Sequence, residues 1–148
     1  MRIIIFGDSI TQGFWDTEHG GWANRLHINE MRRGVESAFE NSKMQYAEII
    51  QKAKVVGPVA LVGIAPIDET KLDPIPWHLT HSYLEESRRV FDEAVQQLAA
   101  EYGCIYIAMG DVFGDDVAGK TVDGIHPNAE GHRLMFERIR GALSEAGL

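Results

Sequence analysis

Residues 82–109 have the sequence SYLEESRRVFDEAVQQLAAEYGCIYIAM, which predicts an amphipathic helix followed directly by a short strand. A capping box at Ser82 and Glu85 is expected to open the helix, and Gly103 is expected to end it. Apolar residues recur between them at spacings of seven, four, three and four positions: Leu84, Phe91, Val95, Leu98 and Tyr102. Because these spacings return to one face of a helix, that face is expected to pack against a core.

Apolar runs at residues 2–6 and 59–64 resemble the run at 105–109 in length and composition, and all three are typical of buried parallel strands. Further helices are predicted in three places: from Trp22 to Met31, from Met44 to a stop at Gly57 and Pro58, and from about Asn128 onward, where Leu134, Met135, Ile139 and Leu143 share a face. Parallel strands need crossover connections, and helices in these connections cover both faces of the sheet. The predicted fold class is therefore α/β.

Composition limits the kinds of partner and the compartment. The 148 residues include 22 acidic and 14 basic side chains, and the net charge of −8 argues against nucleic acid or an anionic membrane as a partner. The length and the hydrophobic content of 45% fit one domain over residues 1–148. The single cysteine, Cys104, lies in an apolar run and is expected to be a buried, inert thiol. Because the first apolar run is too short for a signal-peptide core, and no run is long enough to insert into a membrane, we expect a cytoplasmic protein.

Ser9 follows the first predicted strand in the sequence Gly7-Asp8-Ser9. Open α/β sheets bind ligands at the carboxyl ends of their strands, so a serine at this position is well placed to act as a nucleophile. Glycine and aspartate also form ordinary turns, in which Ser9 would make only local hydrogen bonds. Taken alone, the motif favours the turn.

A second motif, Asp123-Gly124-Ile125-His126, precedes the last predicted helix. A serine hydroxyl becomes a good nucleophile when an imidazole takes its proton, and a carboxylate must orient that imidazole. Gly124 permits a sharp bend that would bring Asp123 to Nδ1 of His126. The alternative for this motif alone is an Asp-Gly turn beside a solvated histidine.

Together, the two motifs resemble the first and last sequence blocks of the SGNH (GDSL-like) hydrolases. The similar segments are Gly7–Thr11, Gly63–Glu69, Asp123–Pro127 and Asn128–His132. The resemblance implies a flavodoxin-like, three-layer α/β/α fold with a central parallel sheet. It also implies a serine esterase that uses Ser9 as nucleophile, His126 as base and Asp123 as its partner, without a cofactor or metal.

Two blocks of that family are not visible in this sequence. They supply a glycine and an asparagine to the oxyanion hole, and Gly34 and Asn41, the candidates in the interval, lack a preceding apolar strand and are not assigned. The three predicted strands also cover only about a tenth of the chain, against roughly 20–25% in globular domains. Both observations indicate that two family strands are missing between about residues 31 and 43. We favour omission of residues from the sequence over their natural loss, and an intact mass well above 16.5 kDa would show it.

The substrate is expected to be a small carboxylic ester: a short acyl ester, a lysophospholipid or an acetylated sugar. The long loop at residues 68–81 contains Trp77, which is a candidate for the rim of an acyl site. One alternative is a non-catalytic binding or scaffold protein of the same fold. Another is a nucleotide-binding protein, which is weak because neither common phosphate-binding glycine motif occurs. The oligomeric state does not follow from the sequence.

Overall fold

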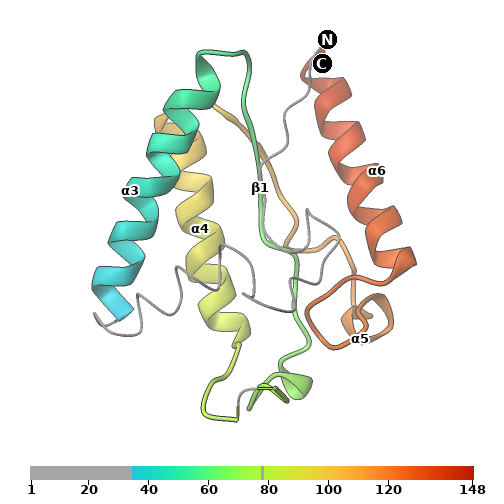
Figure 1. Cartoon of the computed structure of the whole chain (residues 1–148). Helices are drawn as coiled ribbons and strands as arrows, with labels where there is room; N and C mark the ends of the chain where they lie inside the picture. Colours follow the sequence, from blue (N-terminus) through green and yellow to red (C-terminus); the bar gives the residue numbers. More distant parts are fainter. Residues whose placement is uncertain (1–34, 78) are drawn as a thin grey trace. The chain divides into compact units, whose positions relative to one another are not determined.

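The computed structural model describes residues 35–77 and 79–148 (Figure 1). The predicted strand at residues 2–6, the turn with Ser9 and the predicted helix at 22–31 lie outside the described residues. The chain divides into two compact units, residues 1–46 and residues 47–148. All contacts described below lie within the second unit.

The first described helix, α3 (Val35–Lys54), begins nine residues before the predicted start at Met44. Residues 36–48 contain no glycine, proline or β-branched residue, so nothing in this stretch opposes a helix. The predicted end is confirmed to within two residues, because a turn at Val55 and Val56 leads to Gly57. Most of the interval in which family strands were expected to be missing is therefore helical.

The two described strands, β1 (Ala60–Val62) and β2 (Ile105–Ile107), form a parallel pair with Ala60 opposite Ile105. Hydrogen bonds from Ile105 N to Val59 O (2.9 Å) and from Gly63 N to Ile107 O (2.8 Å) extend the pairing at its two ends. Both strands are shorter than the predicted runs. The α/β class with a parallel sheet is confirmed, and the described sheet has two strands.

Helix α4 (Glu85–Glu101) connects β1 to β2, as predicted, but the capping box is wrong. The N-cap is Leu84, and the hydroxyl of Ser82 donates to the carboxylate of Asp73 instead of to the helix. Oε2 of Glu69 accepts the hydrogen bond of Glu85 N at 2.9 Å, so a residue far back in the chain satisfies this free helix donor. The predicted stop is confirmed, because Gly103 has φ +60° directly after the C-cap.

The buried face of α4 is displaced from the predicted one. Its buried residues are Ala94, Leu98 and Ala99, whereas Phe91 is 42% exposed. Of the predicted apolar residues, only Leu98 is buried. Small side chains allow α4 to approach the short strands closely, and the helix contacts both β1 and β2.

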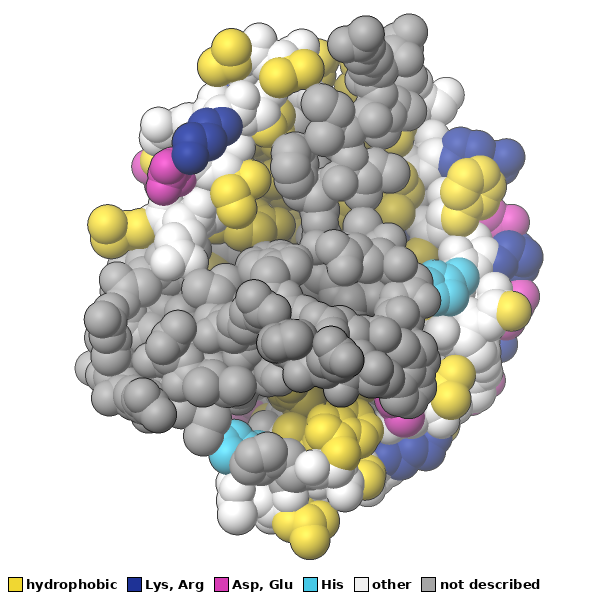
Figure 2. Space-filling model, viewed as in Figure 1, with side chains coloured by type: hydrophobic (Ala, Val, Ile, Leu, Met, Phe, Trp, Pro, Cys, Tyr) yellow, Lys and Arg dark blue, Asp and Glu magenta, His cyan; other side chains and the backbone are white. Residues whose placement is uncertain are grey.

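Helix α6 (Ala129–Glu145) begins after Asn128, whose side-chain oxygen accepts from Glu130 N and Gly131 N at 3.0 Å, as an N-cap does. Its predicted apolar residues pack against a core of four buried residues that extends from β2: Ile107, Met109, Val112 and Phe113. Helices α4 and α6 lie on opposite sides of β1 (Figure 1). Basic and acidic side chains alternate along the side of the molecule where α6 lies (Figure 2). On α6, Arg133 forms ion pairs with Glu130 and Glu137.

The loop that follows β1 is ordered around a short 3-10 helix, η1 (Glu69–Lys71). Leu72 and Ile75 are buried and anchor the loop, whereas Trp77 is 56% exposed. The role of Trp77 at a substrate rim stays a prediction. Among the described residues, no helix is both long and apolar enough to cross a membrane.

Candidate active site

The loop between α5 (Val117–Lys120) and α6 is closed by its own backbone. Thr121 and Pro127 form an antiparallel bridge, and Val122 N donates to His126 O at 2.8 Å. Thr121 is 5% exposed, and its hydroxyl donates to Val117 O at 3.0 Å, which joins the loop to α5. The loop is therefore a fixed platform for the residues at its tip.

Asp123 and His126 face one another at the tip of this loop. His126 Nδ1 lies 2.7 Å from Asp123 Oδ2. The other carboxylate oxygen, Oδ1, accepts hydrogen bonds from His126 N at 2.8 Å and from Ile125 N at 3.1 Å. Gly124 has φ +98°, a conformation that L residues with a side chain rarely adopt, and this bend turns the carboxylate back over the loop. The predicted contact between the two side chains is confirmed.

The electrostatics of the pair favour an ionised carboxylate. Partial burial raises the pKa of Asp123, but the hydrogen bonds from the backbone and ring of His126 and from Ile125 N outweigh it, so the pKa lies below its usual value. An ionised carboxylate only accepts hydrogen bonds, so Nδ1 of a neutral His126 carries the proton and Nε2 carries the basic lone pair. The side chains of His126 and Asp123 are 35% and 33% exposed, and the pair is therefore accessible from solution.

A segment that follows β1 supports the tip of the loop from outside. Asp68 N donates to Gly124 O at 2.8 Å, and a Cβ atom at Gly124 would lie 2.9 Å from Asp68 O. Asp68 is itself fixed, since its carboxylate accepts from the Thr70 hydroxyl at 2.6 Å and lies 3.3 Å from Lys71 Nζ. Gly124 is thus required twice, for its backbone conformation and for this close approach.

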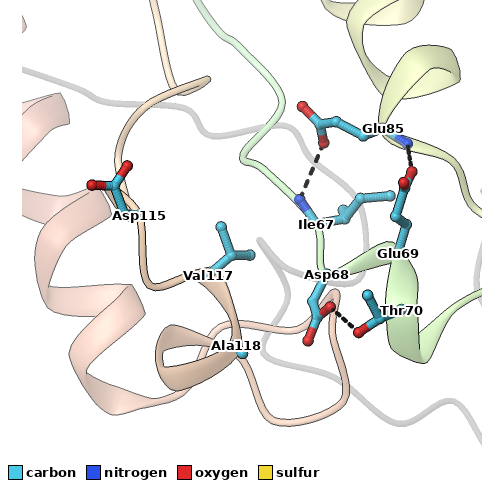
Figure 3. A pocket seen from close by; sticks show the side chains of 8 residues that line it. All are labelled: Ile67, Asp68, Glu69, Thr70, Glu85, Asp115, Val117 and Ala118. Atoms are coloured by element: carbon cyan, nitrogen blue, oxygen red, sulfur yellow. Dashed lines mark hydrogen bonds between the residues drawn. The ribbon is translucent and has the colours of Figure 1, made fainter.

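A pocket of about 310 Å³ lies beside this segment (Figure 3), and its volume is at the small end of ligand sites. Ile67 and Val117 give it apolar side chains, and Asp68 belongs both to the pocket and to the contact with Gly124. The full lining is Ile67, Asp68, Glu69, Thr70, Glu85, Asp115, Val117 and Ala118.

The sequence model of the GDSL-like lipase/acylhydrolase family matches residues 28–134. The chain belongs to this family. The resemblance inferred from the end motifs is therefore confirmed, and the matched region includes both Asp123 and His126. A search of curated proteins found none that matches this chain.

Two solved structures have a similar fold. One is a GDSL-like lipase from Bacteroides thetaiotaomicron, with 20% identity and a TM-score of 0.54, which covers 75% of this chain and 53% of its own. The other is an α/β hydrolase enzyme from the metagenome of Lake Arreo, Spain, with 16% identity and a TM-score of 0.55, which covers 80% and 51%. The chain therefore spans about half the length of each of these proteins.

Of the three predicted site residues, the structure brings Asp123 and His126 together. Ser9, the third, lies outside the described residues. Cys104 is partly buried rather than fully buried, which corrects that expectation. Within residues 35–77 and 79–148, no cluster of His, Cys, Asp and Glu side chains could hold a metal ion. The contact between Asp68 and Gly124 was not predicted, and its one signal in the sequence is the glycine itself.

Proposed function

We propose that this chain belongs to a serine esterase that cleaves small carboxylic esters through an acyl-enzyme on Ser9. The observation that carries the proposal is the 2.7 Å contact between His126 Nδ1 and Asp123 Oδ2, in a chain of the GDSL-like lipase/acylhydrolase family. This contact leaves the basic lone pair of the ring on Nε2, as a general base requires. The substrate is a short acyl ester, a lysophospholipid or an acetylated sugar.

In the proposed mechanism, Nε2 of His126 takes the proton of the Ser9 hydroxyl as Oγ attacks the ester carbonyl. The carboxylate of Asp123 stabilises the resulting imidazolium. His126 then gives the proton to the leaving alcohol, and it later activates the water that hydrolyses the acyl-enzyme. The backbone N–H of Ser9 would supply one oxyanion donor, and each absent donor typically costs about 10²–10³ in kcat.

The proposal includes a flavodoxin-like, three-layer α/β/α arrangement for the intact domain, in the cytoplasm. The proposal keeps the prediction that two family strands are missing between about residues 31 and 43, and the coverage of only about half of each similar structure supports the absence of family elements without locating them. A non-catalytic binding protein of the same fold is the second candidate, and the same short coverage favours it. The two candidates differ in whether Ser9 reacts.

Hydrolysis of a short-chain chromogenic ester by the wild type and by Ser9→Ala, Asp123→Asn and His126→Asn tests the proposal. His132→Asn and Ser87→Ala are matched controls, because both side chains are exposed on helices, His132 on α6 and Ser87 on α4, and neither belongs to the loop that holds Asp123 and His126. We expect the first three variants to lose activity and the two controls to keep it. Equal rates for the wild type and Ser9→Ala would contradict the proposal and support the binding protein.

A second measurement addresses the nucleophile directly. A fluorophosphonate reacts with an activated serine and increases the intact mass by one adduct. We expect the adduct to map to Ser9 and to be absent in His126→Asn. Labelling at another serine, or equal labelling of both proteins, would exclude Ser9 as the activated nucleophile.

A further inference from the structure

Side chains of α4 bind both backbone groups of Ile64, the second residue after β1. Ile64 N donates to Asp92 Oδ1 at 2.9 Å, and Arg88 Nη1 donates to Ile64 O at 2.7 Å. Arg88 is held in turn by Glu85, whose two oxygens lie 2.8 and 2.9 Å from Arg88 Nε. The side chain of Arg88 is 8% exposed and its contact with Ile64 O is charge-assisted, whereas Ile64 itself is 37% exposed.

The packing around Gly63 shows that this arrangement is tight. A Cβ atom at Gly63 would lie 2.7 Å from both Asp92 Oδ1 and the hydroxyl of Tyr106. Tyr106 also donates to Asp92 Oδ1 at 2.8 Å, and burial together with this carboxylate raises the pKa of Tyr106 to about 12. The tyrosine therefore stays protonated, and β2 helps to hold Asp92 against the end of β1.

The same helix holds the other end of the segment. Glu69 Oε2 accepts the hydrogen bond of Glu85 N at 2.9 Å, which Figure 3 shows beside the pocket. Pro66, between the two attachment points, is buried and has a restricted φ. Helix α4 thus fixes residues 64–69 at both ends.

Asp68 lies between these attachment points and donates its N–H to Gly124 O at 2.8 Å. Gly124 separates Asp123 from Ile125 and His126, the residues whose N–H groups bind the Asp123 carboxylate. A continuous series of short contacts therefore runs from Arg88, through residues 64–68, to the proposed acid–base pair. These contacts all lie in residues 47–148, which form one compact unit.

We propose that Arg88, together with Glu85 and Asp92, is a positioning cluster for the Asp123–His126 pair. Without the guanidinium, the carboxylates of Glu85 and Asp92 would lose their shared counter-charge, and Ile64 O would lose its donor. The segment at 64–69 would then move more freely, and Asp68 would hold Gly124 less firmly. The effect on catalysis rests on the proposed function, but the effect on the loop does not.

Arg89 provides a matched control on the same helix. Its side chain is 69% exposed and lies 3.4 Å from Glu85 Oε1, so Arg89→Gln removes the same charge and a contact to the same carboxylate. The structure gives Arg89 no bond to Ile64. Differences between Arg88→Gln and Arg89→Gln therefore report the attachment to Ile64 and not the net charge.

Amide hydrogen exchange of the two variants tests the positioning directly. Because hydrogen bonds to charged groups are typically worth about a ten- to hundredfold change in an opening equilibrium, we expect Asp68 N–H and His126 N–H to exchange at least about tenfold faster in Arg88→Gln. Both amides should keep wild-type rates in Arg89→Gln. Amides in the middle of α6, such as that of Ile139, should be unchanged in both variants.

Equal exchange at Asp68 and His126 in the two variants would overturn the proposal. A uniform acceleration that includes α6 would overturn it as well, because it would show a general loss of stability. If Arg88→Gln does not fold, Arg88→Lys replaces it, since the lysine keeps the charge but loses the paired contact with Glu85. Acceleration at Asp68 and His126, with α6 unchanged, is then expected, and wild-type rates at both amides would refute the proposal.

Ester hydrolysis adds a kinetic readout. We expect Arg88→Gln to lower kcat with little change in KM, because the cluster would orient the base and not bind the ester, and we expect Arg88→Lys to restore part of kcat. A change in KM alone would contradict positioning. If the wild type does not hydrolyse esters, the proposed function fails, and hydrogen exchange still decides whether Arg88 positions the loop.

Discussion

Replacing Asp123 by asparagine tests the acid–base pair with little change in shape. In the wild type, Oδ1 accepts from His126 N and Ile125 N, while Oδ2 faces His126 Nδ1. An asparagine that keeps both backbone bonds through Oδ1 directs its NH₂ group at Nδ1. The imidazole is then forced to carry its proton on Nε2, where it cannot accept the proton of Ser9.

The magnitude follows from the alternative orientation of the amide. Turning the oxygen toward Nδ1 would restore the correct tautomer but break two backbone hydrogen bonds, at about 1 kcal/mol each. The wrong tautomer is therefore favoured by about 2 kcal/mol, or roughly 30-fold in population. Loss of the charge that stabilises the imidazolium adds to this, and the full effect in Ser-His-Asp triads is about 10⁴-fold in kcat.

The assay is the kcat of short-ester hydrolysis near neutral pH, with urea unfolding as a check on the fold. Asp111→Asn is the control, since Asp111 is 77% exposed and forms an ion pair with Arg138 that the same substitution weakens. We expect a loss of 30-fold to 10⁴-fold for Asp123→Asn and about none for the control. A loss below threefold in a folded Asp123→Asn protein would refute the assigned role of Asp123.

Three further predictions concern the loop and its charge. Gly124→Ala should lower the free energy of unfolding in a urea titration by about 1–3 kcal/mol, because φ +98° is unfavourable for alanine and the new Cβ would lie 2.9 Å from Asp68 O; a neutral result would contradict the described bend. Asn128→Ala should cost about 0.5–2 kcal/mol in the same measurement, because it removes the cap of α6, and an unchanged midpoint would show that the cap does not contribute. Burial opposes the ionised form of Asp123, but hydrogen bonds favour it more, so the pKa of Asp123 is lowered in the folded protein. The contribution of this carboxylate to stability is therefore present above its unfolded pKa of about 3.9, and it is lost as the pH falls through the lower folded pKa. The unfolding free energy should thus fall less steeply in acid for Asp123→Asn than for the wild type, and identical acid slopes would exclude this contribution.

Local signals in the sequence predicted the elements that local chemistry decides. Gly103 ended α4 and Asn128 capped α6 as expected, because each acts on residues within one helical turn. The start of α4 was misassigned because its donor is satisfied by Glu69, sixteen residues before Glu85, and no short motif contains that pairing. The displaced buried face of α4 has a similar cause, since the strands it packs against decide which side chains are covered.

In the candidate site, too, contacts between neighbouring residues could be predicted and contacts between distant segments could not. Asp123 and His126 could be predicted as partners because they are three residues apart, with a glycine between them. The contact of Gly124 with Asp68 joins residues 56 positions apart in sequence and depends on how the end of β1 is placed. No sequence motif predicts the attachment of Ile64 to Arg88 and Asp92. The helix was predicted from its apolar residues, such as Phe91, Val95 and Leu98, and the charged side chains do not belong to that pattern.

The acid–base pair is built almost entirely from its own loop, and this has a consequence for the proposed esterase. Both backbone donors to Asp123 and its imidazole partner come from Ile125 and His126, so these three hydrogen bonds are local to the loop. The proposed nucleophile, Ser9, belongs to another part of the chain, and the sequence blocks that would supply the other oxyanion donors are not visible in it. Loss of two family strands would therefore remove expected oxyanion donors while leaving these three hydrogen bonds to Asp123 in place. A folded chain with an intact pair and an unreactive Ser9 would then be the binding protein, and reactivity of Ser9 is the property that separates the two functions.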